Sequence, residues 1–229
     1  MVILMTSLLP PSRQKRLGGT FVSRLCNAAA LTWGANCGRV VAVCFERRGA
    51  FVELWDVYDS NREKVGKTAV RGQGLEAGEY HVVVHIWLVN SEGNFLIQKR
   101  AASVEAAPNI WATTGGSALA GENSAAACAR ELYEEIGVRA DMGKARLAFT
   151  EKRADCFCDI WIIRQSINIE DCKLQVEEVS EVKWASPGEI RFMIAQGTFW
   201  GYRYIEGLFS LVQADESESR PRKRSGFNS

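Results

Sequence analysis

Residues 115–138 read GGSALAGENSAAACARELYEEIGV, a stretch that places four glutamates and a pair of glycines around a run of alanines. Asn123 is a favourable N-cap residue, and Gly137 is a favourable stop for a helix. Between them the apolar residues follow helical spacing along one stripe, which consists of Ala125, Cys128, Ala129, Leu132 and Ile136. The stretch therefore predicts an amphipathic helix that begins at Asn123 and ends at Gly137.

Three carboxylates of this helix, those of Glu131, Glu134 and Glu135, group together on a face away from the stripe. Like charges at such spacing destabilise an isolated helix by a few tenths of a kcal/mol per pair, and only Arg130 is near enough to offset them. A hard divalent cation such as Mg²⁺ would resolve the conflict, because it takes oxygen ligands. From composition alone, a solvated acidic face remains an alternative.

The glycines before the helix predict a flexible turn. Gly115 and Gly116 let the backbone approach closely, so that a carbonyl could join a metal shell, and Gly121 lets the loop swing into the helix.

Composition limits the kind of partner. The chain has 229 residues, of which 47% are hydrophobic, so one principal domain is expected. Its 28 basic and 27 acidic residues leave a net charge of +1, which excludes the global positive field typical of a nucleic-acid binder. Seven cysteines, odd in number and without a CxxC pair, indicate a reduced compartment. Cys156 and Cys158 alternate along a strand, and we expect packing rather than metal binding.

The chain divides into three parts by composition. Residues 1–50 are expected to be a basic, poorly ordered extension, since no acid precedes Glu46, and residues 1–45 also resemble a presequence. The central domain is expected at 51–213, with Val52 a candidate start because no methionine lies between Met5 and Met142. A disordered charged tail is expected at 214–229. We expect a cytoplasmic protein, or an organellar one if the presequence is genuine.

The central domain mixes strands and helices. Hairpins are expected from 53–59 with 64–70 and from 80–89 with 94–100, because turn residues separate extended runs. Further strands are expected at 145–153, 156–165 and 180–186, and helices at 187–197 and 201–213. A mixed sheet covered by helices follows from this order.

The quoted stretch also matches a fixed pattern. Gly116, five residues, Glu122, seven residues and then RELYEEIGV fit G-x5-E-x7-R-E-U-x-E-E-x-G-U, where U is apolar, at every position. This pattern resembles the Nudix box, and the wider resemblance to Nudix domains runs from about Val52 to Gln213. It implies an α+β fold, an α/β/α sandwich with a mixed sheet. It also implies hydrolysis of the diphosphate bond in a nucleoside diphosphate linked to another group, using Mg²⁺ or Mn²⁺.

The resemblance also implies residue roles. It makes Glu131 and Glu134 catalytic, with Arg130 orienting Glu131. The implied metal ligands are Glu131, Glu134, Glu135, the Gly115 carbonyl and, from outside the box, Glu178 or its neighbour Glu177. Gly116, Glu122 and Gly137 are implied to be structural.

Two other functions remain as alternatives. The strand from 80 to 89 is similar to one in isopentenyl diphosphate isomerases, where His81 matches a metal-binding histidine, but Gly115 stands where that family carries its catalytic thiol. We therefore expect His81 and His85 to be hydrogen-bonded structural residues. A nucleotide-sensing module without catalysis is the second alternative, although an intact box argues against it.

The substrate is not determined by the sequence. Ala154 stands where ADP-ribose pyrophosphatases tend to have proline. Four tryptophans could stack on a base but are expected in the core, namely Trp87, Trp111, Trp161 and Trp200. The expected partner is a small-molecule nucleoside diphosphate derivative. We expect no nucleic acid and no membrane span, and leave a homodimer open.

Overall fold

The computed structural model describes residues 45–47 and 50–219. Its main sheet has seven strands, which are β5 (His81–Val89), β6 (Phe95–Arg100), β7 (Trp111–Ala112), β8 (Thr114–Ser117), β9 (Ala145–Lys152), β10 (Cys156–Arg164) and β11 (Val179–Ala185). The strand order is β11–β6–β5–β10–β9, with β7 added to β6 and β8 added to β5. β10 runs parallel to β5, and the other pairs are antiparallel, so the expected mixed sheet is confirmed.

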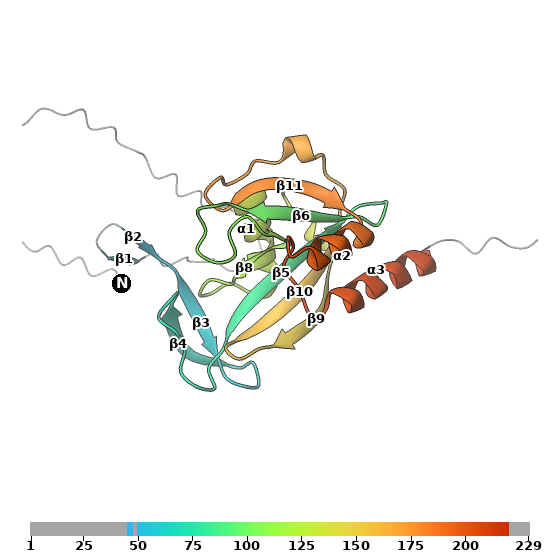
Figure 1. Cartoon of the computed structure of the whole chain (residues 1–229). Helices are drawn as coiled ribbons and strands as arrows, with labels where there is room; N and C mark the ends of the chain where they lie inside the picture. Colours follow the sequence, from blue (N-terminus) through green and yellow to red (C-terminus); the bar gives the residue numbers. More distant parts are fainter. Residues whose placement is uncertain (1–44, 48–49, 220–229) are drawn as a thin grey trace, which may run out of the picture. The chain divides into compact units, whose positions relative to one another are not determined.

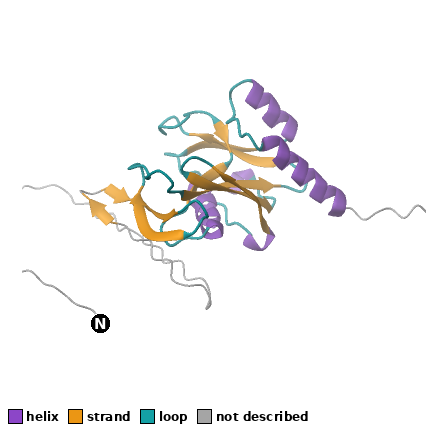
Figure 2. Ribbon diagram, turned by 90° about the horizontal axis from the view of Figure 1, so that it is seen from below, coloured by secondary structure: helices purple, strands orange, loops and turns teal. Residues whose placement is uncertain are grey.

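The two faces of the sheet carry separate cores. Along β5, Val82, Val84, Ile86 and Leu88 pack on one face, while Trp87 and Val89 pack on the other. This follows from the period of two in a strand, which turns successive side chains to opposite faces. The first face packs against α1 (Ser124–Ile136), and the second against α2 (Pro187–Ala195) and α3 (Ile205–Ser219). Figure 2 shows α1 on the opposite side of the sheet from α2 and α3, which is the expected α/β/α sandwich.

The helix boundaries follow from their caps. Asn123 accepts a hydrogen bond from the Ala126 amide, and Gly137 ends α1 in the left-handed conformation at φ 72°, both as expected. α2 begins with Pro187 after a capping box formed by Ser186 and Glu189. In the part of the chain that the structure describes, no helix is long and apolar enough to cross a membrane.

The expectation of a disordered tail from residue 214 is wrong for its first residues. This helix begins at Ile205 rather than near 201 and runs to Ser219, so residues 214–219 are helical instead of disordered. Asp215 binds Arg146 of β9 at 2.6 Å, and Arg164 donates to the carbonyl of Val212, which ties the last turns to the sheet. Residues 220–229 lie outside the described residues.

Two hairpins precede the main sheet. β1 (Phe45–Arg47) pairs with β2 (Ala50–Val52), so the end of the expected extension contains strands, while 1–44 and 48–49 lie outside the described residues. β3 (Leu54–Tyr58) pairs with β4 (Lys64–Val70), as the sequence predicted (Figure 1). Two 3₁₀ turns, η1 (Met142–Lys144) and η2 (Ile169–Asp171), complete the described elements.

Candidate functional site

The paired glycines do not form the expected turn. Gly115 and Gly116 lie in β8, where they pair with His85 and Val84 of β5. A Cβ atom on Gly115 would collide with the Val84 carbonyl, and one on Gly116 would collide with the carboxylate of Glu131. The absence of side chains therefore serves close packing, because it lets β8 lie against β5 and lets Glu131 approach the β8 backbone. Gly121 does have the expected turn conformation, with φ 85°.

Arg130 connects most of the charged groups of the box. Its Nε and Nη2 donate to the two oxygens of Glu122 at 2.8 and 3.0 Å, and its Nη1 donates to Glu131 and to Glu134, each at 2.9 Å. The fifth hydrogen bond goes from Nη2 to the carbonyl of Ser117 at 2.9 Å. All five N–H groups of the guanidinium are thus used. Arg130 does contact Glu131, and Glu122 joins the loop to the helix by also accepting from the Leu119 amide.

The three glutamates differ in exposure and in their partners. The Glu134 side chain is 51% exposed, whereas Glu135 is only 9% exposed and accepts a hydrogen bond from Gln98 at 2.7 Å. The Glu131 side chain is 12% exposed. The buried stripe of α1 is rotated accordingly, with Ala127 and Glu135 buried in place of Ala125 and Ala129. The sequence did not show this because the helix packs against β8 and β11 as well as β5.

The buried carboxyls are hard to ionise. Burial raises the pKa of Glu131 to about 7, although Arg130 opposes the shift. Burial and the charge of Glu131 raise the pKa of Glu135 to about 8. An adjacent cation would favour the ionised form of both groups. Their oxygens are the kind of donor that a hard divalent cation prefers.

A complete metal site is nevertheless not preassembled. Among residues 45–47 and 50–219, no three His, Cys, Asp or Glu side chains converge closely enough to hold an ion. The expectation that Glu131, Glu134 and Glu135 are metal ligands stays a prediction. Arg130 binds two of these carboxylates, and Gln98 binds the third.

Other residues surround these carboxylates. Glu178 is half-buried and its charge acts on Glu135, while the Glu177 side chain is exposed. Sequence analysis missed Gln98, whose Oε1 accepts from Thr114 of β8 at 2.7 Å while its amide binds Glu135. The signal for Gln98 was a polar residue directly after the apolar run FLI in a strand.

The two histidines of β5 have different surroundings. His85 Nδ1 lies 2.6 Å from the hydroxyl of Tyr204, which confirms its structural hydrogen bond, and burial lowers the pKa of His85 to about 3. His81 instead stacks on Trp55, with ring centroids 3.9 Å apart. Its Nδ1 has no hydrogen-bond partner among the described residues, so the expected bond is wrong for His81.

The remaining candidates are mostly structural. Trp87 is fully buried, and Trp111 and Trp161 are half-buried, whereas Trp200 is 45% exposed and does not belong to the core as expected. Cys158 is in the core that packs against α2 and α3, and Cys156 is buried beside it on β10, which confirms packing for both.

Comparison with known proteins agrees with this arrangement. A family model described as NUDIX domain matches residues 79–208. The chain is 38% identical over 164 residues to an uncharacterized Nudix hydrolase of Listeria monocytogenes, an alignment that covers 71% of this chain and 97% of that protein. It is 30% identical over 159 residues to Nudix hydrolase 3 of Arabidopsis thaliana, covering 63% of this chain and 20% of that protein.

The fold is also similar to a solved structure. The crystal structure of DR0079 from Deinococcus radiodurans superposes with a TM-score of 0.56 at 24% identity, covering 71% of this chain and 98% of that one. The family match spans the whole box, including Arg130 and the two glutamates that it binds, Glu131 and Glu134. This chain therefore belongs to the Nudix family and is a Nudix hydrolase.

Proposed function

We propose that this Nudix hydrolase cleaves the diphosphate bond of a nucleoside diphosphate linked to another group, with Mg²⁺ as the cation and Mn²⁺ as a substitute. The observation that carries the proposal is the approach of Glu131 to the backbone of Gly116, where a Cβ would not fit. Burial disfavours the charged form of a carboxylate, so holding Glu131 against β8 costs free energy. A role in catalysis would account for that cost.

The Nudix family generally uses divalent cations, and such an ion, when bound, neutralises charge on diphosphate oxygens and acidifies a water. In this chain, Glu131 and Glu135 are the buried ligands we propose, and Glu134 is the exposed one. The Gly115 carbonyl and Glu178 remain further candidates. Arg130 keeps Glu131 in one rotamer through the hydrogen bond at 2.9 Å. The exposed Glu134 can leave Arg130 at little cost, since exposed pairs are worth at most about 1 kcal/mol.

The isomerase alternative lacks its acid, because Gly115 in β8 has no side chain to supply one. No observation favours the sensing module over the hydrolase. We therefore carry the hydrolase alone into the experiment.

The test is a screen of nucleoside diphosphate derivatives with Mg²⁺, with Mn²⁺ and with EDTA, scored by release of monophosphates or phosphate. We expect turnover with either cation and none with EDTA. Glu131→Gln and Glu134→Gln should each lower turnover by orders of magnitude, because metal-assisted charge neutralisation is worth several kcal/mol. Binding of a nucleotide without cation-dependent turnover would contradict the proposal and favour the sensor.

A further inference from the structure

The hairpin of β3 and β4 lies outside the residues 79–208 that match the family model, yet it holds the loop of the box. The Ala120 amide donates to the Leu54 carbonyl at 2.7 Å, and the Gly121 amide donates to the Asp56 carboxylate at 2.8 Å. The loop that leads into α1 is therefore bonded to β3 through both backbone and side chain.

The hairpin is also fixed at its other end. Arg62 in its turn forms an ion pair with Asp159 of β10, whose side chain is fully buried. Thr150 donates to the same carboxylate at 2.6 Å. Between the two ends, Trp55 stacks on His81 with an interplanar angle of 9°. Because a buried ion pair and a stacked ring pair both restrict movement, the hairpin is a rigid support for the residues at its open end.

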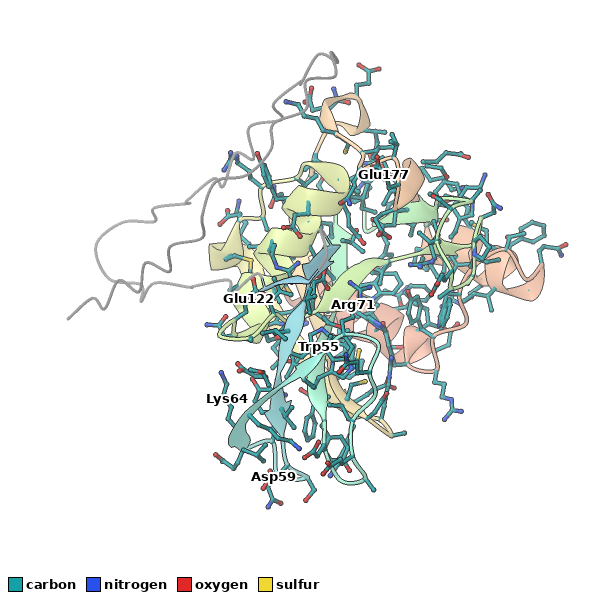
Figure 3. All side chains as sticks on the ribbon, turned by 90° about the vertical axis from the view of Figure 1, so that its left-hand side faces the viewer. Trp55, Asp59, Lys64, Arg71, Glu122 and Glu177 are labelled. Atoms are coloured by element: carbon teal, nitrogen blue, oxygen red, sulfur yellow. The ribbon has the colours of Figure 1, made fainter. Side chains whose placement is uncertain are left out.

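Glu53 and Arg71 flank this open end. The Arg71 amide donates to the Glu53 carbonyl at 3.0 Å, and its Nη1 donates to the Glu53 carboxylate at 2.7 Å. With Val52 and Val70 they line a surface hollow of about 260 Å³. Figure 3 shows Arg71 at the end of the hairpin away from Asp59, which marks the turn. This end of the hairpin lies beside the loop of the box, because the carbonyl of Leu54, next to Glu53, accepts from the Ala120 amide. The charge of Arg71 acts on Glu131 and Glu178.

Arg71 differs from Arg130 in that most of its guanidinium N–H groups do not donate a hydrogen bond to a described residue. Among the described residues, the Arg71 side chain donates only to Glu53, and it is 62% exposed. A guanidinium has five N–H donors, and its fork matches the oxygens of a phosphate. A diphosphate approaching Glu131, Glu134 and Glu135 would meet negative charge, which the remaining N–H donors of Arg71 would offset.

We infer that Arg71 is a substrate-binding residue that contacts the diphosphate group, with Glu53 orienting its guanidinium. This inference rests on the proposed function, since it names a second contact for the same substrate. The shared chemistry is a diphosphate, whether it belongs to a nucleoside diphosphate or is free pyrophosphate.

The experiment measures binding without catalysis. The affinity of Arg71→Ala for inorganic pyrophosphate and for adenosine 5′-(α,β-methylene)diphosphate is determined by calorimetry in EDTA. We expect at least a tenfold loss of affinity for the nucleoside ligand, which is about 1.4 kcal/mol. Arg71→Lys should lose less, because it keeps the charge without the fork. An equal loss for pyrophosphate would indicate recognition of the diphosphate alone, and a smaller one would indicate that the nucleoside brings the group to Arg71.

The matched control is Lys67→Ala, which removes one positive charge from the same hairpin, where the half-exposed Lys67 pairs with Glu79. It should bind both ligands as the wild type does. Arg71 is exposed, so a melting temperature near that of the wild type is expected and separates binding from folding. Unchanged affinity of Arg71→Ala for both ligands would overturn the inference, and so would an equal loss in Lys67→Ala. Cation-dependent hydrolysis by the wild type would then still support the proposed function.

Discussion

Replacing Arg130 by alanine should destabilise the protein far more than an ordinary surface substitution. The change removes five hydrogen bonds, of which three go to Glu122 and to the Ser117 carbonyl. Glu122 is only 6% exposed and would keep just the Leu119 amide as a donor. Removing one partner of a buried ion pair costs about 3–5 kcal/mol, because the other charge is left without compensation. The bond to the exposed Glu134 adds only about 0.3–0.5 kcal/mol.

The chain offers a matched comparison for this substitution. Arg191 also forms two parallel hydrogen bonds to one glutamate, Glu206, at 2.9 and 2.8 Å, but both side chains are about half exposed. Arg191→Ala should therefore cost at most about 1 kcal/mol. The free energies of unfolding are measured by urea denaturation in EDTA. The double variant Arg130→Ala with Glu122→Gln should recover part of the loss, since it removes the stranded charge. Equal costs for Arg130→Ala and Arg191→Ala would refute the assignment of Arg130 as a buried structural clamp.

Three further predictions concern β8, α3 and α1. Gly116→Ala should abolish turnover while the protein still folds, because the new Cβ would displace Glu131, and circular dichroism with a turnover assay would check it. Gly207→Ala in α3 meets nothing within 4 Å and should raise the free energy of unfolding by up to about 1 kcal/mol in urea melts. In EDTA, Glu135 should favour the folded state most below pH 4.5 and lose this contribution as the pH rises to about 8, since its pKa is raised on folding. Between pH 5 and pH 8, the free energy of unfolding should fall less steeply in Glu135→Gln than in the wild type. The difference in slope should be up to about 1.4 kcal/mol per pH unit.

Local signals in the sequence predicted the local structure well. The caps at Asn123 and Gly137, the start of α2 at Pro187 and the hairpin turns each depend on residues within a few positions. Long-range contacts were not predictable in the same way. Arg62 and Asp159 are 97 residues apart, and the Gly121 bond to Asp56 spans 65 residues. Only the packing of the hairpin on the sheet brings these groups together.

The glycine pair at 115–116 was expected to form a flexible turn, but it lies in strand β8. Glycine is compatible with both a flexible turn and a close approach of two chains, and the sequence around 115–116 does not distinguish them. The pairing of β5 decides between the two structures. β6 pairs with β5 only at Val89 and Phe95, so Val84 and His85 pair with β8 instead. β8 fills that position, where a Cβ on Gly115 would collide with the Val84 carbonyl and a Cβ on Gly116 with the present position of the Glu131 carboxylate.

Arg130 changes how the acidic helix should be understood. The sequence indicated mutual repulsion that a divalent cation must relieve, but the structure already supplies a cation within the chain, bonded to Glu122, Glu131 and Glu134. Burial raises the pKa of Glu135 to about 8, which favours its protonated form when no metal is bound. Arg130 thus offsets part of the negative charge of the metal-free site, and burial suppresses the ionisation of Glu135. A divalent cation must instead displace a proton and compete with Arg130, and its affinity should accordingly rise with pH.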